Sequence, residues 1–184
     1  QRKHIKPRLE AVLEFFKNER RTEKRKVLLC LSKDSKDSID ALAVEADGIT
    51  AKDKPEYLAE LMVGHWNALD GRNEFQDCDT VVVLSWPYPP NHLAIDLLFA
   101  ATDPANRTDD FLQSSKELRK ELELGHVGAS VIQAVNRVRC RKVTSDDGSC
   151  QPTDIFMLLP PETSTNAKSM RETLEREMPG MVFS

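Results

Sequence analysis

Three closely spaced arginines, Arg137, Arg139 and Arg141, are the residues of this sequence with the clearest chemistry. An arginine side chain is always charged and donates paired hydrogen bonds, so it suits a phosphate group. On a helix predicted over residues 131–141, Gln133, Arg137 and Arg141 fall on one side. Arg139 falls near the edge of the opposite, apolar stripe unless the helix ends or loosens first. That stripe consists of Val131, Ala134, Val135 and Val138. The pattern predicts a helix that buries one side and can bind phosphate with the other, or, more plainly, a basic amphipathic helix with a solvated face.

A turn-rich stretch with Gly71, Arg72 and Asn73 is the second candidate. Gly71 suits a positive φ or a close approach of the backbone. The stretch leads into residues 79–86, which read as a strand because they are short, apolar and β-branched. Polar, glycine-containing loops beside such strands often carry function.

A third candidate is the polar pair Ser32 and Lys33, which directly follows the apolar run 27–31. A continuous apolar run of this length is typical of a strand buried on both faces in a parallel sheet. Ligands of open parallel sheets bind where the strands end. Ser32 and Lys33 are therefore candidates for phosphate contacts, and a solvated loop is the alternative.

The elements that must position these residues alternate between strands and helices. Strands are predicted over residues 27–31, 79–86 and 155–159, and helices over 5–20, 36–46, 55–62, 92–101, 111–124, 131–141 and 164–178. A break is predicted at residues 125–128, which contain two glycines. Alternation of this kind predicts an α/β fold with a mostly parallel sheet.

Length, net charge and cysteine content limit the classes of protein to which the chain could belong. A chain of 184 residues predicts one domain, 25–184, preceded by a helix and connector, 1–24. The net charge of −4 does not indicate a nucleic-acid binder, so any such binding must come from local basic patches. No apolar run approaches the roughly 20 residues of a membrane span. Four cysteines without metal-type spacing indicate a reducing, intracellular protein, cytoplasmic or nuclear, without a zinc site.

Two of these stretches together resemble a known family. Residues 69–84 look like motif V of superfamily 2 helicases, a glycine-containing turn before a strand. Residues 133–139 are similar to motif VI, a glutamine followed by two arginines. Their order and spacing, with strand 27–31 before them, resemble the C-terminal RecA-like lobe of such a helicase over residues 25–160. The resemblance implies a three-layer RecA-like fold of the P-loop NTPase type, with helices on both faces of the sheet.

The resemblance also implies a role for each candidate. The catalytic residues would be Arg137 and Arg139, as fingers that stabilise charge on the γ-phosphate of ATP. Nucleotide contacts would come from Gly71, Asn73, Gln133 and Arg141, and nucleic-acid contacts from Ser32, Lys33 and Arg72. The spacing leaves open whether Arg139 or Arg141 is the second finger, because Cys140 stands at the usual position. ATP and Mg²⁺ would be bound mainly by an N-terminal RecA-like lobe of the same protein. The partner would be a nucleic acid, with DNA favoured over RNA, although the sequence does not distinguish the two.

Two departures from the family pattern shape the expectation. Asn136 stands where motif VI has glycine, and the sequence contains neither a P-loop nor an Asp-Glu pair ending a strand. We therefore expect this chain to be one half of an ATPase and inactive alone. The main alternative is a degenerate RecA-like lobe that binds a protein or nucleic acid without catalysis. A small-molecule enzyme is a third hypothesis, but the histidines His65, His92 and His126 show no partner set.

Overall fold

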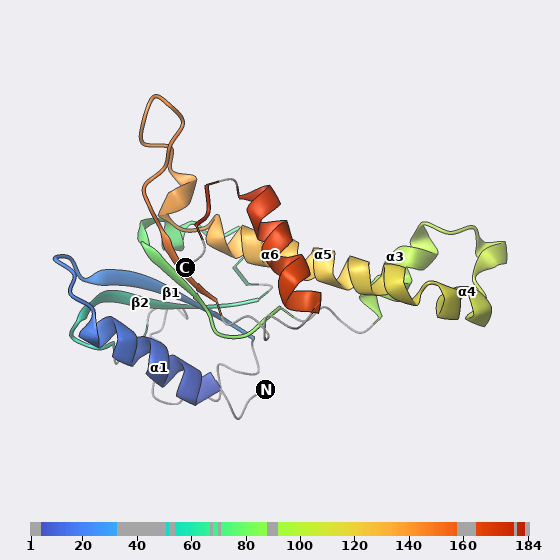
Figure 1. Cartoon of the computed structure of the whole chain (residues 1–184), viewed down its shortest axis with the longest axis horizontal. Helices are drawn as coiled ribbons and strands as arrows, with labels where there is room; N and C mark the ends of the chain where they lie inside the picture. The colour runs from blue at the N-terminus through green and yellow to red at the C-terminus, as the bar shows by residue number, and fades with distance from the viewer. Residues whose placement is uncertain are drawn as a thin grey trace. The chain divides into compact units, whose positions relative to one another are not determined.

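A computed structural model gives the fold of this chain. It describes residues 5–32, 51, 54–66, 68–69, 71–87, 92–157, 165–178 and 180–182. They fall into two compact units (Figure 1). The sheet unit comprises Gln1–Pro87 and Gln133–Leu158, and the helical unit comprises Tyr88–Ile132 and Leu159–Ser184.

The sheet unit is built on four parallel strands in the order β2-β1-β3-β4. Their bounds are Arg25–Leu31 for β1, Leu58–His65 for β2, Thr80–Val83 for β3 and Asp154–Met157 for β4. The three predicted strands correspond to β1, β3 and β4, and the α/β class with a parallel sheet is confirmed. The central strands are buried along almost their whole length, as their continuous apolar sequences predict.

The strand β2 corrects the helix predicted over residues 55–62. Leu58, Leu61 and Met62 have helical spacing, but Leu61, Met62 and Val63 are buried in succession. In a helix three consecutive side chains would point in different directions, whereas a strand of a parallel sheet that is covered on both faces buries successive side chains. Pairing with β1, with Val63 opposite Leu29, therefore decides the structure of this short segment.

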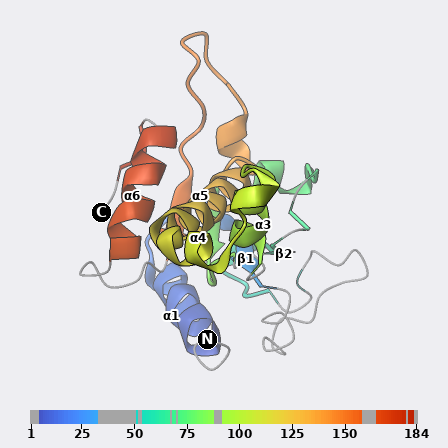
Figure 2. The same cartoon turned by 90° about the vertical axis from the view of Figure 1, so that its right-hand side faces the viewer.

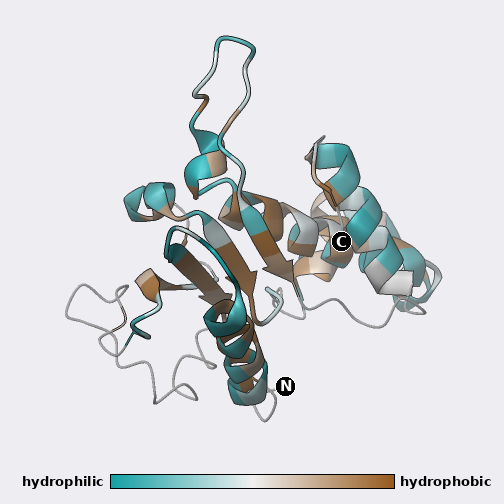
Figure 3. Ribbon diagram, turned by 60° about the vertical axis from the view of Figure 1, so that its left-hand side comes forward, coloured by the Kyte–Doolittle hydropathy of each residue, from teal (hydrophilic) through white to brown (hydrophobic). Residues whose placement is uncertain are grey.

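Helix α1, Ile5–Asn18, packs on one face of the sheet. Its buried side chains Ile5, Leu9 and Phe16 share a core with alternate residues of β1, Val27, Leu29 and Leu31. The predicted boundary between residues 24 and 25 thus runs through a shared core, and α1 belongs to the sheet unit. Figure 3 shows α1, the helix next to the N-terminus, lying against the apolar strands.

Helix α5, Lys116–Val135, shows that the helix predicted over residues 131–141 was placed wrongly. It runs through the break predicted at residues 125–128 and ends before the arginines, which lie in a turn and a short 3-10 helix, η4, Arg139–Arg141. Gly128 serves packing here, because a Cβ on it would lie 3.1 Å from the Thr173 side chain. The apolar stripe is buried as predicted: Val131, Ala134, Val135 and Val138 are each at most 1% exposed.

The helical unit contains α3, α4, most of α5 and α6 (Figure 2). The bounds are Leu93–Ala100 for α3, Pro104–Asn106 for the 3-10 helix η3, Asp109–Ser114 for α4 and Thr165–Glu177 for α6. The helix predicted over residues 111–124 is divided, because α4 starts at a Thr108 cap and stops at Ser114. Among the described residues, no helix has the length and apolar character to cross a membrane. The predicted helix 36–46 lies outside the described residues.

Candidate functional site

The amino edge of the sheet, where β1, β3 and β4 begin, brings two distant stretches of sequence together. One is the loop with η2, Glu74–Asp77, which leads into β3. The other is η4, which follows α5 and leads toward β4. Because parallel strands start at the same edge, the segments that precede β3 and β4 must meet there. Direct contacts join η2 to η4.

One backbone hydrogen bond and two side-chain contacts hold these segments against each other. The backbone N–H of Arg139 donates to the Cys78 carbonyl over 3.1 Å. Lys142 Nζ lies 2.7 Å from Asp77 Oδ1, and Arg141 Nη1 donates to Asn73 Oδ1 over 3.3 Å. The structure therefore places the predicted nucleotide residues Asn73 and Arg141, 68 positions apart, side by side. The Lys142 ammonium also lowers the pKa of the Asp77 carboxyl.

Gly71 has the positive φ that was the first of its two predicted roles. Gly71 has φ +75°, a conformation that glycine adopts without steric cost. A Cβ on Gly71 would meet nothing within 4 Å, so no other backbone approaches it closely. Arg72, the next residue, is half-buried.

The three arginines differ in their surroundings because the helix ends before them. Arg137 is half-buried in the turn after α5, with its backbone N–H donating to Ala134 O. Arg139 is half-buried and donates from Nε and Nη2 to the Pro152 carbonyl, at 2.9 and 2.5 Å. Arg141 is exposed. Gln133, predicted to face the same ligand, is exposed on the last turn of α5.

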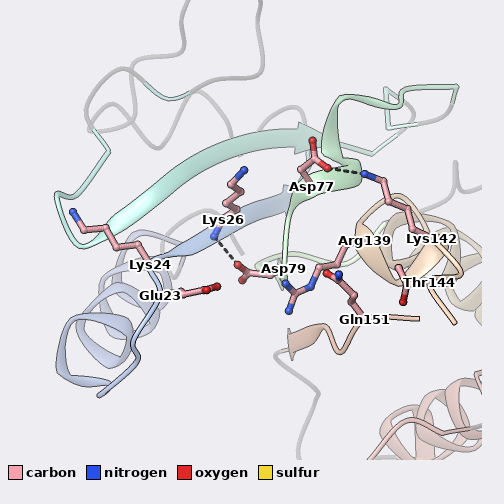
Figure 4. Close-up of a pocket in the computed structure, with 9 residues that line it drawn as sticks. All are labelled: Glu23, Lys24, Lys26, Asp77, Asp79, Arg139, Lys142, Thr144 and Gln151. Carbon is pink, nitrogen blue, oxygen red and sulfur yellow. Dashed lines mark hydrogen bonds and ion pairs between the residues drawn. The ribbon is translucent and has the colours of Figure 1, made fainter. Parts of the chain in front are cut away.

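An open pocket of about 330 Å³ lies beside Arg139 at this edge (Figure 4). Its lining residues are Glu23, Lys24, Lys26, Asp77, Asp79, Arg139, Lys142, Thr144 and Gln151. Two of its carboxylates already have partners: Asp77 binds Lys142, and Asp79 accepts from the backbone N–H of Lys26 and the hydroxyl of Thr80. With four cations and three carboxylates, the lining has a small excess of positive charge.

Ser32 lies at the opposite edge, where the strands end. Its backbone N–H donates to Ser85 Oγ over 2.7 Å, and Trp66 Nε1 donates to the Ser85 carbonyl over 2.8 Å. The seven residues of β1 separate this carboxyl edge from the amino edge by roughly 20 Å. Lys33 lies outside the described residues. The structure thus groups Asn73, Arg139 and Arg141 and leaves Ser32 at the other edge.

A buried arginine beneath the amino edge was not among the predicted residues. Arg25 is 4% exposed, and it donates twice to Glu19 and once each to Thr80 and Asp154, all at 2.7 Å. Its guanidinium also lies 4.9 Å from the Phe16 ring centroid. Asp77 and Lys142 were also missed. A charged residue directly before an apolar strand is the available signal for Arg25, but solvated strand ends carry the same signal.

The cysteines fit the structural role predicted for them. Cys30 and Cys78 are buried free thiols, and burial raises the pKa of both, that of Cys78 to about 12. Thiols in such surroundings are poor nucleophiles and poor metal ligands. Within the described part of the chain, no group of three or more His, Cys, Asp or Glu side chains could hold a metal ion.

Comparison with known proteins adds no identification: no family model, curated protein or solved structure matches the chain. Guanidinium and ammonium groups on short, anchored segments can bind a phosphate or another small anion. No nucleophile paired with a base is present among the residues that line the pocket.

Proposed function

We propose that this chain is the second lobe of an ATP-dependent nucleic-acid helicase or translocase. The observation that carries the proposal is the meeting of the Gly71–Asn73 turn with the arginine segment at one edge of a parallel sheet, with contacts at Asn73, Asp77 and Cys78. The resemblance to motifs V and VI rested on two stretches of sequence that need not have met. Their proximity supports one shared role.

In this proposal the two edges of the sheet have different tasks. The amino edge, with Arg137 and the exposed Arg141, turns toward the phosphates of ATP held by a partner RecA-like lobe. Mg²⁺ and ATP would be bound mainly by that lobe, and the metal would neutralise phosphate charge there. The arginines of this chain add positive charge near the γ-phosphate. At the carboxyl edge, Ser32 would contact the nucleic-acid backbone, and Lys33, the next residue in the sequence, is the second predicted contact. Arg72, the third predicted contact, lies in the turn at the amino edge.

A non-catalytic lobe is the second candidate, and two observations favour it. Asn136 occupies the position where motif VI has glycine, and Arg139 already donates two hydrogen bonds to a carbonyl of its own chain. Such a lobe would keep the scaffold and bind nucleic acid or protein without stimulating ATP turnover.

Steady-state ATP hydrolysis by the complete protein separates the two candidates. Replacing Arg137 by alanine removes a cation from the γ-phosphate, so we expect turnover to fall on the order of 10³-fold. The matched control is Arg176→Ala, which removes an arginine exposed on α6 and should leave turnover unchanged. Unchanged turnover in Arg137→Ala would favour the non-catalytic lobe. Hydrolysis by this chain alone would contradict the proposal itself.

A further inference from the structure

We infer that Arg139 is a positioning residue, which anchors the following hairpin so that Arg141 faces the phosphate. The inference rests on the proposed function and resolves which arginine accompanies Arg137. It follows from the hydrogen bonds that each guanidinium makes.

The hairpin, residues 142–152, stands away from the sheet (Figure 1). Its two legs meet in a bridge between Val143 and Cys150, and its turn closes with Gly148 at φ +82°. Every residue of the hairpin is exposed. A projection with so little burial depends on its base for a fixed orientation.

Arg139 joins the two legs at that base. Its backbone N–H donates to Cys78 O, which fixes the first leg to the sheet. Its guanidinium donates twice to Pro152 O, which ties down the second leg. Two residues later, Asp154 is held by its own N–H bond to Asp79 O and by the buried Arg25. The segment from η4 to β4 is therefore closed at Arg139 and fixed at β4.

This geometry gives Arg139 and Arg141 different tasks. To bind a phosphate through its Nε and Nη2 edge, Arg139 would have to leave the Pro152 carbonyl and release the hairpin. Arg141, two residues on, makes one hydrogen bond of 3.3 Å to Asn73 and is exposed. Lys142 beside it is paired with Asp77. Arg141 is thus the guanidinium of η4 that can bind a phosphate without disturbing the fold.

A double-mutant cycle tests the inference, with inorganic tripolyphosphate as the probe and NMR to measure its affinity for the chain. Arg141→Ala removes a direct contact with the probe, so it should weaken binding roughly tenfold. Arg139→Ala should also weaken it, by roughly fivefold, because Arg141 is then misplaced. If Arg139 acts through Arg141, the double variant binds no more weakly than Arg141→Ala. Multiplied losses in the double variant would overturn the inference and make Arg139 a direct ligand.

Hydrogen exchange gives a reading independent of the ligand. Arg139→Lys keeps the charge but loses the guanidinium fork, so we expect faster exchange of the Thr144 amide, which donates to Ser149 O across the hairpin. Unchanged exchange would overturn the anchoring role. The matched control is Arg107→Ala, since Arg107 donates from Nε and Nη2 to the Thr102 carbonyl in the helical unit. It should alter neither binding nor hairpin exchange. A wild-type chain that does not bind tripolyphosphate would contradict the proposed function, whatever the exchange shows.

Discussion

At the amino edge of the sheet, different segments are joined by an ion pair and by hydrogen bonds from charged side chains. At the carboxyl edge they are joined by hydrogen bonds between neutral groups. Asp77 and Lys142 form an exposed ion pair at the first edge. At the second, the Ser85 hydroxyl and carbonyl hold the Ser32 N–H and the Trp66 indole, and both Ser85 and Trp66 are buried. Exposed ion pairs contribute little to stability, while unsatisfied buried polar groups cost more.

The difference shows how one sheet can keep exchangeable contacts apart from structural ones. The outer layer of the amino edge, with Arg141 and Lys142, can exchange its partners for a ligand at small cost. At the carboxyl edge, the loss of a hydrogen-bond partner would cost more free energy, because the groups there are buried. Beneath the outer layer, however, Arg25 gives the amino edge a buried structural layer of its own. Substitutions in the buried layer of the amino edge, at the carboxyl edge and in the outer layer of the amino edge should therefore differ in the size of their effect on stability.

Arg25→Ala should have the largest effect on stability. It removes the buried guanidinium, so Glu19, Thr80 and Asp154 lose their donor, and Phe16 and Phe156 lose their packing against it. We expect the free energy of unfolding to fall by about 3 kcal/mol, measured by urea denaturation. The control Arg176→Ala breaks an exposed ion pair with Glu177 and should cost less than about 1 kcal/mol. Equal losses in both variants would show that the amino edge has no buried layer.

Ser85→Ala should have an intermediate effect. The variant leaves the Ser32 N–H without its acceptor, so the expected loss is about 1–2 kcal/mol in the same measurement. Ser114→Ala is the matched control, because the Ser114 hydroxyl donates to Phe111 O on an exposed face of α4. A loss at Ser85 no greater than at Ser114 would remove the distinction between the two edges.

Lys142→Ala should have the smallest effect, visible mainly as a change in pH dependence. Because the folded pKa of Asp77 is lowered, its contribution to stability is complete above its unfolded pKa of about 3.9. That contribution is lost as the pH falls through the lower folded value. In Lys142→Ala the Asp77 pKa should rise toward its ordinary value in an NMR titration of the carboxyl. An unchanged Asp77 pKa would contradict the pairing.

Local sequence predicted much of this fold, and the failures share one cause: contacts with segments that are distant in the sequence. The strands β1, β3 and β4 have continuous apolar sequences, and the buried stripe of Val131 to Val138 follows from helical spacing alone. By contrast, β2 is decided by its pairing with β1. The continuity of α5 was not predicted because Gly125 and Gly128 read as a break, whereas Gly128 lies in contact with Thr173.

For the site, the types of the residues were predictable and their partners were not. Asn73 and Arg141 were candidates by sequence, and the parallel sheet explains why they meet. The bond from Arg139 to Pro152 depends on a hairpin that returns the chain to its starting point 13 positions later. No periodicity in the sequence indicates such a return, so spacing alone could not separate Arg139 from Arg141.

The most direct test of the central claim is a map of where the wild-type chain binds phosphate. Tripolyphosphate is titrated into the chain, and backbone amide shifts are followed by NMR. We expect the shifting amides to cluster at the amino edge, at residues 71–78 and 137–142. The dissociation constant should be on the order of 1 mM, since one or two cationic side chains act without a partner lobe. Shifts confined to the carboxyl edge around Ser32 and Ser85, or no shifts at all, would contradict it.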